Sequence, residues 1–222
     1  MGKDKLRRWA ELLTMERVFQ PDEKIITEEF RIKGNWHADV FKNNNPIVLE
    51  LGCGKGEYTV NLAQHFGNKN FIGIDIKGAR LWRGAKTINE NKIMNAAFLR
   101  TRVEFIEQCF AENEVSEIWI TFPDPQPGNA REHKRLTHSS FIERYFKFLS
   151  STGIIHLKTD DLPFFEYSVE SLSKYKGVFI ELTKDLYNDI TDNEILNIKT
   201  FYEKRWLAEG KKINYLQFQF QR

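Results

Sequence analysis

Three glycines and two acidic residues in the first half of the chain have the spacing of a cofactor site. The segment ELGCGKG occupies residues 50–56, so glycines alternate with other residues directly after an apolar stretch. Gly52 and Gly54 allow the backbone to turn sharply beside a ligand. Asp75 follows at about the 20-residue distance at which a carboxylate binds the ribose hydroxyls of a nucleotide. The pattern predicts a site for a nucleotide-like cofactor at the end of a strand.

The charge of Glu50 indicates which cofactor fits. Folds that bind a dinucleotide use the pattern G-x-G-x-x-G to place a helix N-terminus against an anionic pyrophosphate. Glu50 precedes the first glycine of the turn closely and would repel that anion. S-adenosylmethionine carries a sulfonium and an ammonium and no phosphate. We therefore expect S-adenosylmethionine at Glu50, Gly52, Gly54 and Asp75, and methyl transfer rather than hydride transfer. The alternative is a glycine turn with solvated acids at the strand ends.

A third acid, Asp124, lies in the segment FPDP at residues 122–125. The proline that follows Asp124 favours an extended backbone at this residue. Because the segment closes an apolar stretch, we expect the carboxylate at the carboxyl edge of a sheet, beside the cofactor and in the catalytic centre. The alternative is an aspartate that forms a local backbone hydrogen bond in a turn.

Basic residues form two local groups in a chain whose formal net charge is only +2. Arg131, Lys134 and Arg135 are the best candidates for contacts with a nucleic-acid backbone, together with the N-terminal group Lys3, Lys5, Arg7 and Arg8. A solvated charged face is the alternative. The overall balance of charge does not by itself predict nucleic-acid binding.

Apolar stretches that alternate with amphipathic ones predict the elements that position these residues. Seven strands are expected, at residues 47–51, 71–76, 97–102, 117–122, 153–159, 178–182 and 213–220. Helices are expected between them, at residues 57–66, 79–91 and 103–110, after an N-cap at Thr137, and from Pro163 to about residue 174. This rhythm predicts an α/β, Rossmann-like fold with a mostly parallel seven-stranded sheet and helices on both faces.

Length and composition predict a single domain. Its 222 residues, 41% of them hydrophobic, are enough for one ordinary core. Residues 1–45 are polar and look like an irregular arm, anchored on the domain of residues 46–222 by Trp9, Phe19, Phe30 and Trp36. No apolar run is long enough to span a membrane, and neither the two cysteines nor the histidines have metal-ligand spacing. We expect a cytoplasmic protein without metal or membrane contact, as a monomer or homodimer.

Four segments in the same order resemble the bacterial TrmB family, the tRNA (guanine-N7)-methyltransferases, from Phe19 to Phe220. The first two are LELGCGKGEY at residues 49–58 and NFIGIDIKGARLWRG at residues 70–84. The third is FPDP followed by KRLT at residues 134–137, and the fourth is LKTDD at residues 157–161 together with TFYEKR at residues 200–205. Their shared order is far more specific than any one segment.

The resemblance implies an activity and assigns further residues to it. It implies transfer of the methyl group of S-adenosylmethionine to N7 of a guanosine in the variable loop of tRNA. Asp124 then stands at the catalytic centre, and Asp160, Thr200 and Glu203 match positions that hold the target guanine region. We expect in-line attack by N7, with carboxylates accepting hydrogen bonds from the guanine N1 and amino groups. Methylation of another substrate, or a non-catalytic RNA-binding module, are the alternatives.

Two positions depart from the family pattern. Arg102 falls where the third strand of family members usually ends in an acid or amide near the adenine, so the resemblance implies that Arg102 serves the cofactor through its backbone. Gly128 aligns with a lysine position that contacts the substrate, and any contact there must also come from backbone. We therefore expect this protein to depend more on Lys134, Arg135 and its N-terminal arm for tRNA binding.

Overall fold

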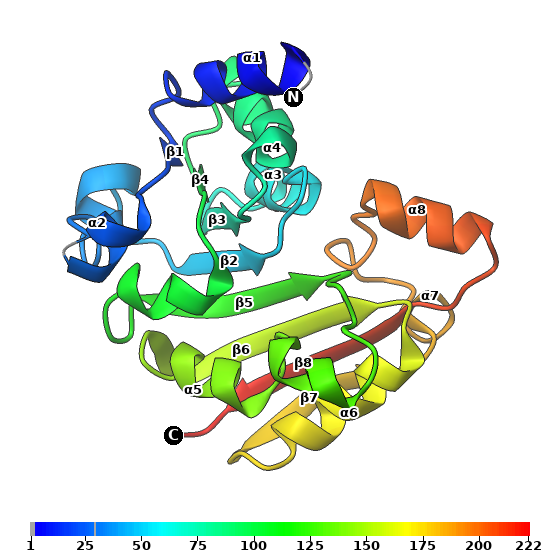
Figure 1. Ribbon diagram of the computed structural model, residues 1–222. Helices are drawn as coiled ribbons and strands as arrows, with labels where there is room; N and C mark the ends of the chain where they lie inside the picture. The colour runs from blue at the N-terminus through cyan, green and yellow to red at the C-terminus, as the bar shows by residue number, and fades with distance from the viewer. Residues whose placement is uncertain (1–2, 29) are drawn as a thin grey trace.

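A mixed eight-stranded sheet runs through the computed structural model, which describes residues 3–28 and 30–222 (Figure 1). The strands are β1 (Val18–Phe19), β2 (Ile47–Leu51), β3 (Asn70–Ile74), β4 (Ala96–Leu99), β5 (Val115–Thr121), β6 (Leu149–Thr159), β7 (Gly177–Thr183) and β8 (Asn214–Phe220). Their order across the sheet is β1-β4-β3-β2-β5-β6-β8-β7. All neighbours are parallel except that β8 runs antiparallel to both β6 and β7. The mostly parallel Rossmann-like sheet is confirmed.

The expected number of seven strands is wrong, because β1 adds an edge strand from the N-terminal segment. Val18 pairs with Phe98 and Phe19 pairs with Leu99. A strand of two residues is too short to show an alternating pattern, so periodicity could not reveal it. It exists because the edge of β4 offers free backbone groups to a neighbouring extended segment.

Helices cover both faces of the sheet (Figure 1). The α-helices are α1 (Lys3–Leu12), α2 (Glu23–Glu28), α3 (Glu57–His65), α4 (Gly78–Glu90), α5 (Ser139–Tyr145), α6 (Leu162–Leu172), α7 (Leu186–Asp189) and α8 (Phe201–Ala208). Buried residues of β2 alternate between the two faces: Leu49 and Leu51 belong to one core cluster and Val48 to the other. Each face therefore has its own apolar core.

The sequence suggested that residues 1–45 are irregular, but the described residues of this segment, 3–28 and 30–45, form several regular elements. These elements are α1, β1, α2 and a π-helical turn at Trp36–Phe41, and α1 packs along α4. Trp36 is fully buried, stacks on Phe110 at 5.3 Å between ring centroids and donates from Nε1 to the Cys109 carbonyl at 2.9 Å. The anchoring role expected of Trp36 thus has a clear physical basis. The division of the chain at residue 45 stays a proposal.

Two helices differ from their predicted form. The stretch after the third predicted strand is a 3₁₀-helix, Val103–Gln108, rather than an α-helix. Thr137 does not cap the next helix: His138 is the N-cap and accepts a hydrogen bond from the Ser140 amide, while Thr137 is buried against Ser168 at 2.7 Å. α5 ends at Tyr145, so the apolar residues that follow it belong to the connection and to β6.

The strand order reverses between β2 and β5, and this reversal places the candidate site. β3 lies on one side of β2, and the chain returns to the other side with β5. Crevices outside the carboxyl ends of parallel strands occur at such a point. In Figure 1 the loop leading to α8 reaches the ends of β2 and β5. Within residues 3–28 and 30–222, no helix has the length and apolar character needed to cross a membrane.

Candidate active site

The glycine turn after β2 adopts a backbone that side chains disfavour. Gly52, Gly54 and Gly56 have φ angles of 70°, 56° and 69°. A Cβ atom on Gly52 would meet nothing within 4 Å, so the turn leaves open space beside its backbone. At Gly56 a Cβ atom would lie 2.5 Å from the ring of Phe98, so glycine is required there for close packing. The turn is thus closely packed at Gly56 and leaves open space at Gly52.

Glu50 is buried beneath this turn and is held by neutral groups. Its Oε2 accepts hydrogen bonds from the Thr59 amide at 2.8 Å and from the Thr59 hydroxyl, and its Oε1 accepts from the Thr121 hydroxyl at 2.7 Å. Burial raises the pKa of Glu50 to about 7; these hydrogen bonds act in the opposite direction, and the charge of Asp75 adds to the increase. A cation placed beside Glu50 would therefore stabilise its charged form.

Asp75 joins the glycine turn to the loop after β3. Its Oδ2 accepts from the Gly54 amide at 2.9 Å and its Oδ1 from the Lys77 amide at 2.7 Å. Asp75 is partly exposed. Its carboxylate is thus oriented by backbone groups and still reaches the surface of the cleft, which fits the ribose role that the sequence predicted.

Two adjoining hollows share Gly52 and Asp75 and together form a cleft across the strand ends, which we call the donor cleft. One, of about 380 Å³, is lined by Gly52, Asp75, Ile76, Thr101, Arg102, Val103, Glu104, Lys134, Leu136 and Phe141. The other, of about 100 Å³, is lined by Glu50, Gly52, Cys53, Gly54, Lys55, Glu57, Asp75, Arg80, Thr121, Phe122, Thr200 and Tyr202. All four cofactor residues deduced from the glycine turn thus meet in one place.

Arg102 lines the larger hollow of the donor cleft, but it does not lie at the end of a strand. β4 ends at Leu99, so the predicted strand 97–102 is too long, and Arg102 is the extended residue before the 3₁₀-helix. Its side chain is exposed. The extended backbone directs the chain along the cleft, in keeping with the backbone contribution expected of Arg102, which stays a prediction.

The FPDP segment leaves β5 with a strained backbone. Phe122 has a φ angle of 48°, a left-handed conformation that costs a bulky residue about 1–3 kcal/mol and is concentrated at functional sites. Phe122 lines the donor cleft, and Asp124 follows it as an exposed residue. Oδ1 of Asp124 accepts from the Gln126 amide at 3.1 Å, the local bond considered as the alternative. Its Oδ2 has no hydrogen-bond partner among the described residues.

The basic residues after Gly128 differ in exposure. Gly128 has a φ angle of 82° and precedes the 3₁₀-helix Asn129–Lys134. Arg131 and Lys134 are exposed, and Lys134 lines the donor cleft. Arg135 is half-buried over the ring of Tyr167 at 4.3 Å, and its Nε donates to the Gln126 carbonyl at 3.4 Å. Arg135 therefore supports the loop, while Lys134 is placed for a ligand. The side chain of Lys3 lies outside the described part.

The three residues expected near the guanine differ in their surroundings. Thr200 lines the donor cleft and caps α8. Asp160 is partly exposed and pairs with Lys211 at 2.7 Å. Glu203 is fully buried and pairs with the equally buried Lys158 at 2.7 Å, with its other oxygen accepting from the Thr200 amide at 3.3 Å. A direct contact between Glu203 and a guanine stays a prediction.

Several residues of the site escaped the sequence reasoning. Thr59 and Thr121 hold Glu50, and Tyr202 lines the donor cleft. Nothing in the local sequence distinguishes these threonines from solvent-exposed ones. Lys158 did leave a signal, because it lies within the predicted strand 153–159, next to the apolar Leu157, and lysine is almost never fully buried without a partner.

The donor cleft has the chemistry that S-adenosylmethionine requires. The acids Glu50 and Asp75 suit a ligand with cationic groups, and the hollow beside Gly52 admits a ligand against the backbone. Glu57 in the first turn of α3 adds a further negative charge at this turn, which disfavours a pyrophosphate. Across the described residues there is no group of three or more His, Cys, Asp or Glu side chains that could hold a metal ion.

Comparisons with known proteins identify the type of fold. The model of a family described as "Putative methyltransferase" matches residues 44–216. Among solved structures, the 16S rRNA methyltransferase KamB has a TM-score of 0.62 at 12% identity over 82% of this chain and 91% of its own. An antibiotic-related methyltransferase has a TM-score of 0.59 at 16% identity over 88% of this chain and 98% of its own. At these identities the likeness shows the fold.

Sequence relatives are much more similar. A protein of Bacteroides fragilis named tRNA (guanine-N(7)-)-methyltransferase is 50% identical over 98% of this chain and 86% of its own length. A protein of Christiangramia forsetii with the same name is 50% identical over 98% of both chains. Identity of this level over nearly the whole length establishes common membership. The chain belongs to the tRNA (guanine-N(7)-)-methyltransferase family.

Proposed function

We propose that this protein transfers the methyl group of S-adenosylmethionine to N7 of a guanosine in the variable loop of tRNA. The observation that carries the proposal is the donor cleft, in which Glu50 and Asp75 flank an open glycine turn. Membership of the family supports tRNA as the substrate. We further propose a cytoplasmic protein that is a monomer or homodimer.

The site residues would act by binding and orientation. S-adenosylmethionine, when bound, supplies an electrophilic methyl group on a sulfonium. Glu50 and Asp75 would hold its cationic and ribose groups, and Gly52, Gly54 and the Arg102 backbone would line its course along the cleft. Guanine N7 has a free lone pair at neutral pH, so no general base is needed and positioning dominates the rate.

Asp124 would orient the base. Because the Gln126 amide occupies its Oδ1, Oδ2 is the atom available to accept a hydrogen bond from the guanine N1 or amino group. A carboxylate there also offsets the positive charge that develops on the methylated ring. Asp160 and Thr200 would also contact the guanine that accepts the methyl group, and Glu203 would lie beside them.

The test is incubation of the protein with labelled S-adenosylmethionine and unmodified tRNA, followed by reduction and aniline treatment. Chain cleavage at a single variable-loop guanosine is the expected result, because 7-methylguanosine becomes a cleavage site under these conditions. Label without cleavage would place the methyl group on another atom or substrate. Binding of tRNA without any label would indicate an RNA-binding module of the same fold.

The tRNA surface can be tested at two neighbouring residues. Reversal of charge at Lys134 should weaken tRNA binding by about 1 kcal/mol or more, because the exposed ammonium at the cleft can reach a phosphate. The change at Arg135 should mainly lower the melting temperature, because its side chain packs on Tyr167. Affinity is measured at fixed low salt. Unchanged affinity in the Lys134→Glu, Arg135→Glu double variant would remove this segment from the proposed tRNA surface.

A further inference from the structure

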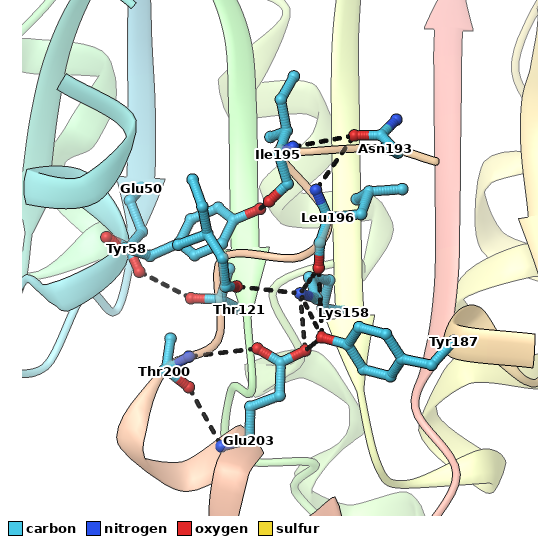
Figure 2. Close-up of polar contacts among 11 residues, drawn as sticks. Glu50, Tyr58, Thr121, Lys158, Tyr187, Asn193, Ile195, Leu196, Thr200 and Glu203 are labelled. Carbon is cyan, nitrogen blue, oxygen red and sulfur yellow. Dashed lines mark hydrogen bonds and ion pairs between the residues drawn. The ribbon is translucent and has the colours of Figure 1, made fainter. Parts of the chain in front are cut away.

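Lys158 is the centre of a buried polar cluster next to Thr200, at the edge of the donor cleft where we expect the acceptor base (Figure 2). Its side chain is completely buried on β6, and its Nζ lies 2.7 Å from Glu203 Oε1 and 3.1 Å from the Leu196 carbonyl. The Tyr187 hydroxyl donates to the same Glu203 oxygen and lies 3.4 Å from Nζ. A buried cation with this many partners is held in a single position.

The cluster fixes the course of residues 190–200, which lead to α8. Lys158 donates to the Leu196 carbonyl and reaches the Ile198 carbonyl at 3.5 Å, and the Tyr58 hydroxyl of α3 donates to the Ile195 carbonyl at 3.2 Å (Figure 2). These donors come from side chains far away in the sequence and bind backbone oxygens. The segment is therefore held from beneath by β6 and α3.

Glu203 transmits this restraint to the first turn of α8. Its Oε2 accepts from the Thr200 amide at 3.3 Å while the Thr200 hydroxyl accepts from the Glu203 amide at 3.2 Å, which forms a capping box. The Phe201 amide donates to Glu57 on α3 at 2.7 Å. The position of Tyr202, between these anchored residues, is thus set by Lys158 through Glu203.

Two exposed aromatic rings stand at this anchored turn. Tyr202 is 41% exposed and lines the donor cleft together with Glu50 and Thr121. Phe201 is 54% exposed, its ring meets that of Tyr202 edge to face at 5.7 Å, and Lys55 Nζ lies 4.2 Å from the Phe201 ring centroid. Exposed rings beside a cation are a platform for an unstacked nucleobase and its phosphate.

We propose that Lys158 is a positioning residue that acts through Glu203 to hold the Tyr202 ring at the donor cleft, where this ring stacks on the acceptor nucleobase. The inference rests on the proposed function, because it names the side chain that would receive the tRNA base. Tyr202 lies at the smaller hollow with Glu50 and does not line the larger hollow that contains Arg102. Because the adenine of the cofactor is expected near Arg102, we place the Tyr202 ring at the other end of the cofactor, where the methyl group would meet the acceptor base.

The first experiment replaces the ring. Tyr202→Ala should lower kcat/KM for tRNA about tenfold, the effect expected for loss of one stacked base, with the dissociation constant of S-adenosylmethionine within twofold of wild type. Tyr202→Phe keeps the ring and should retain most activity. Equal activity of Tyr202→Ala and wild type, or loss of cofactor binding instead of tRNA turnover, would overturn the proposal.

The second experiment tests whether the buried cluster acts through that ring. Lys158→Met removes the central cation, and the milder Tyr187→Phe, which removes only a hydroxyl from Glu203, carries the same test where the lysine variant does not fold. Each should lower kcat/KM for tRNA severalfold in the wild-type background and by a clearly smaller factor in Tyr202→Ala, where only the contacts proposed for Thr200 and Glu203 remain to be disturbed. Effects that multiply in the double variant would show that the cluster does not act through Tyr202.

A matched control separates positioning from general stability. Tyr215→Phe also removes a buried hydroxyl, which lies 2.9 Å from His156 Nδ1, and neither of these residues lines the donor cleft. It should lower the melting temperature about as much as Tyr187→Phe but leave kcat/KM unchanged. Failure of the proposed function has a different signature, because wild type would then form no 7-methylguanosine.

Discussion

Two buried glutamates of this protein, Glu50 and Glu203, are held in opposite ways. Glu50 is 4% exposed and accepts hydrogen bonds from the neutral groups of Thr59 and Thr121. Glu203 is 0% exposed and pairs with the ammonium of Lys158. An acid satisfied by neutral donors keeps a negative charge that a cationic ligand can still compensate. The charge of an acid paired with a buried lysine is already compensated, so we expect Glu203 to act mainly by fixing the structure around it.

The surroundings of the two glutamates also shift pKa values in different ways. Burial raises the pKa of Glu50 to about 7, so a cationic ligand beside this carboxyl would favour its charged form. Burial lowers the pKa of the Lys158 ammonium, and Glu203 acts in the opposite direction. The donor cleft is thus responsive to a ligand, whereas the lysine cluster is already complete.

The largest effect should come from breaking the lysine cluster. Lys158→Met leaves Glu203 buried without a cation, and the free energy of unfolding should fall by about 3–5 kcal/mol, as measured by urea denaturation. Lys174→Met, at the exposed pair with Glu170, is the control and should change stability by less than about 0.5 kcal/mol. A similar cost for both variants would erase the distinction between the two glutamates.

A third acid, Asp124, contrasts with both because it is exposed. Asp124→Asn keeps the hydrogen bond from the Gln126 amide through its remaining oxygen and removes the charge. Turnover should fall about 100-fold or more, since the carboxylate would no longer offset charge on the base, while affinity for S-adenosylmethionine largely survives. Single-turnover methylation and cofactor titration measure the two effects. Near-normal methylation would remove Asp124 from the catalytic centre.

Glu50→Gln should affect the ligand and spare the fold. The glutamine oxygen can accept from Thr59 while its amide donates to the Thr121 hydroxyl, so the buried bonds remain satisfied. Affinity for S-adenosylmethionine should fall by about 1.5–2 kcal/mol, a factor of about 10 to 30. Isothermal titration measures the affinity. A loss of stability as large as that of Lys158→Met would contradict the neutral-donor reading of Glu50.

The smallest predicted effect is a pH dependence of cofactor binding. A bound cation lowers the pKa of Glu50, so binding releases a proton and affinity should fall about fivefold between pH 8 and pH 6. The sign for stability without cofactor is the reverse. Because the folded pKa is raised, the contribution of Glu50 to stability is present at low pH and is lost as the pH rises from about 4.5 toward 7.

The Glu50→Gln variant is the control for this titration. Asp75 is the other acid that faces Glu50, and it remains in the variant. The pH slope in affinity should disappear when Glu50 is replaced, and the pH slope in melting temperature should lose the contribution of Glu50 while that of buried His156 remains. A slope in affinity that persists would assign the titration to another group.

The sequence alone predicted most of the sheet and a cofactor site near Glu50 and Asp75, because local patterns encode both. Apolar stretches between amphipathic ones predicted most strands to within a few positions, and glycine spacing with Glu50 and Asp75 predicted a cofactor site at the strand ends, where a cleft is found. Segments without a period were the errors: β1 has two residues, and Thr137 precedes the true cap by one position. The helical continuation past Tyr145 failed because β6 begins at Leu149 and takes that stretch into the sheet.

Only the tertiary structure decided what the acids do. In the sequence Glu50 and Glu203 are both acids in short motifs. Thr200 indicates a capping box with Glu203, but nothing near either acid shows the side chains that decide whether its charge is compensated. Folding brings Thr59 and Thr121 to Glu50 and brings Lys158 and Tyr187 to Glu203. The pKa and the role of an acid depend on its burial and on the charge of its partners, and both are set by contacts between residues distant in the chain.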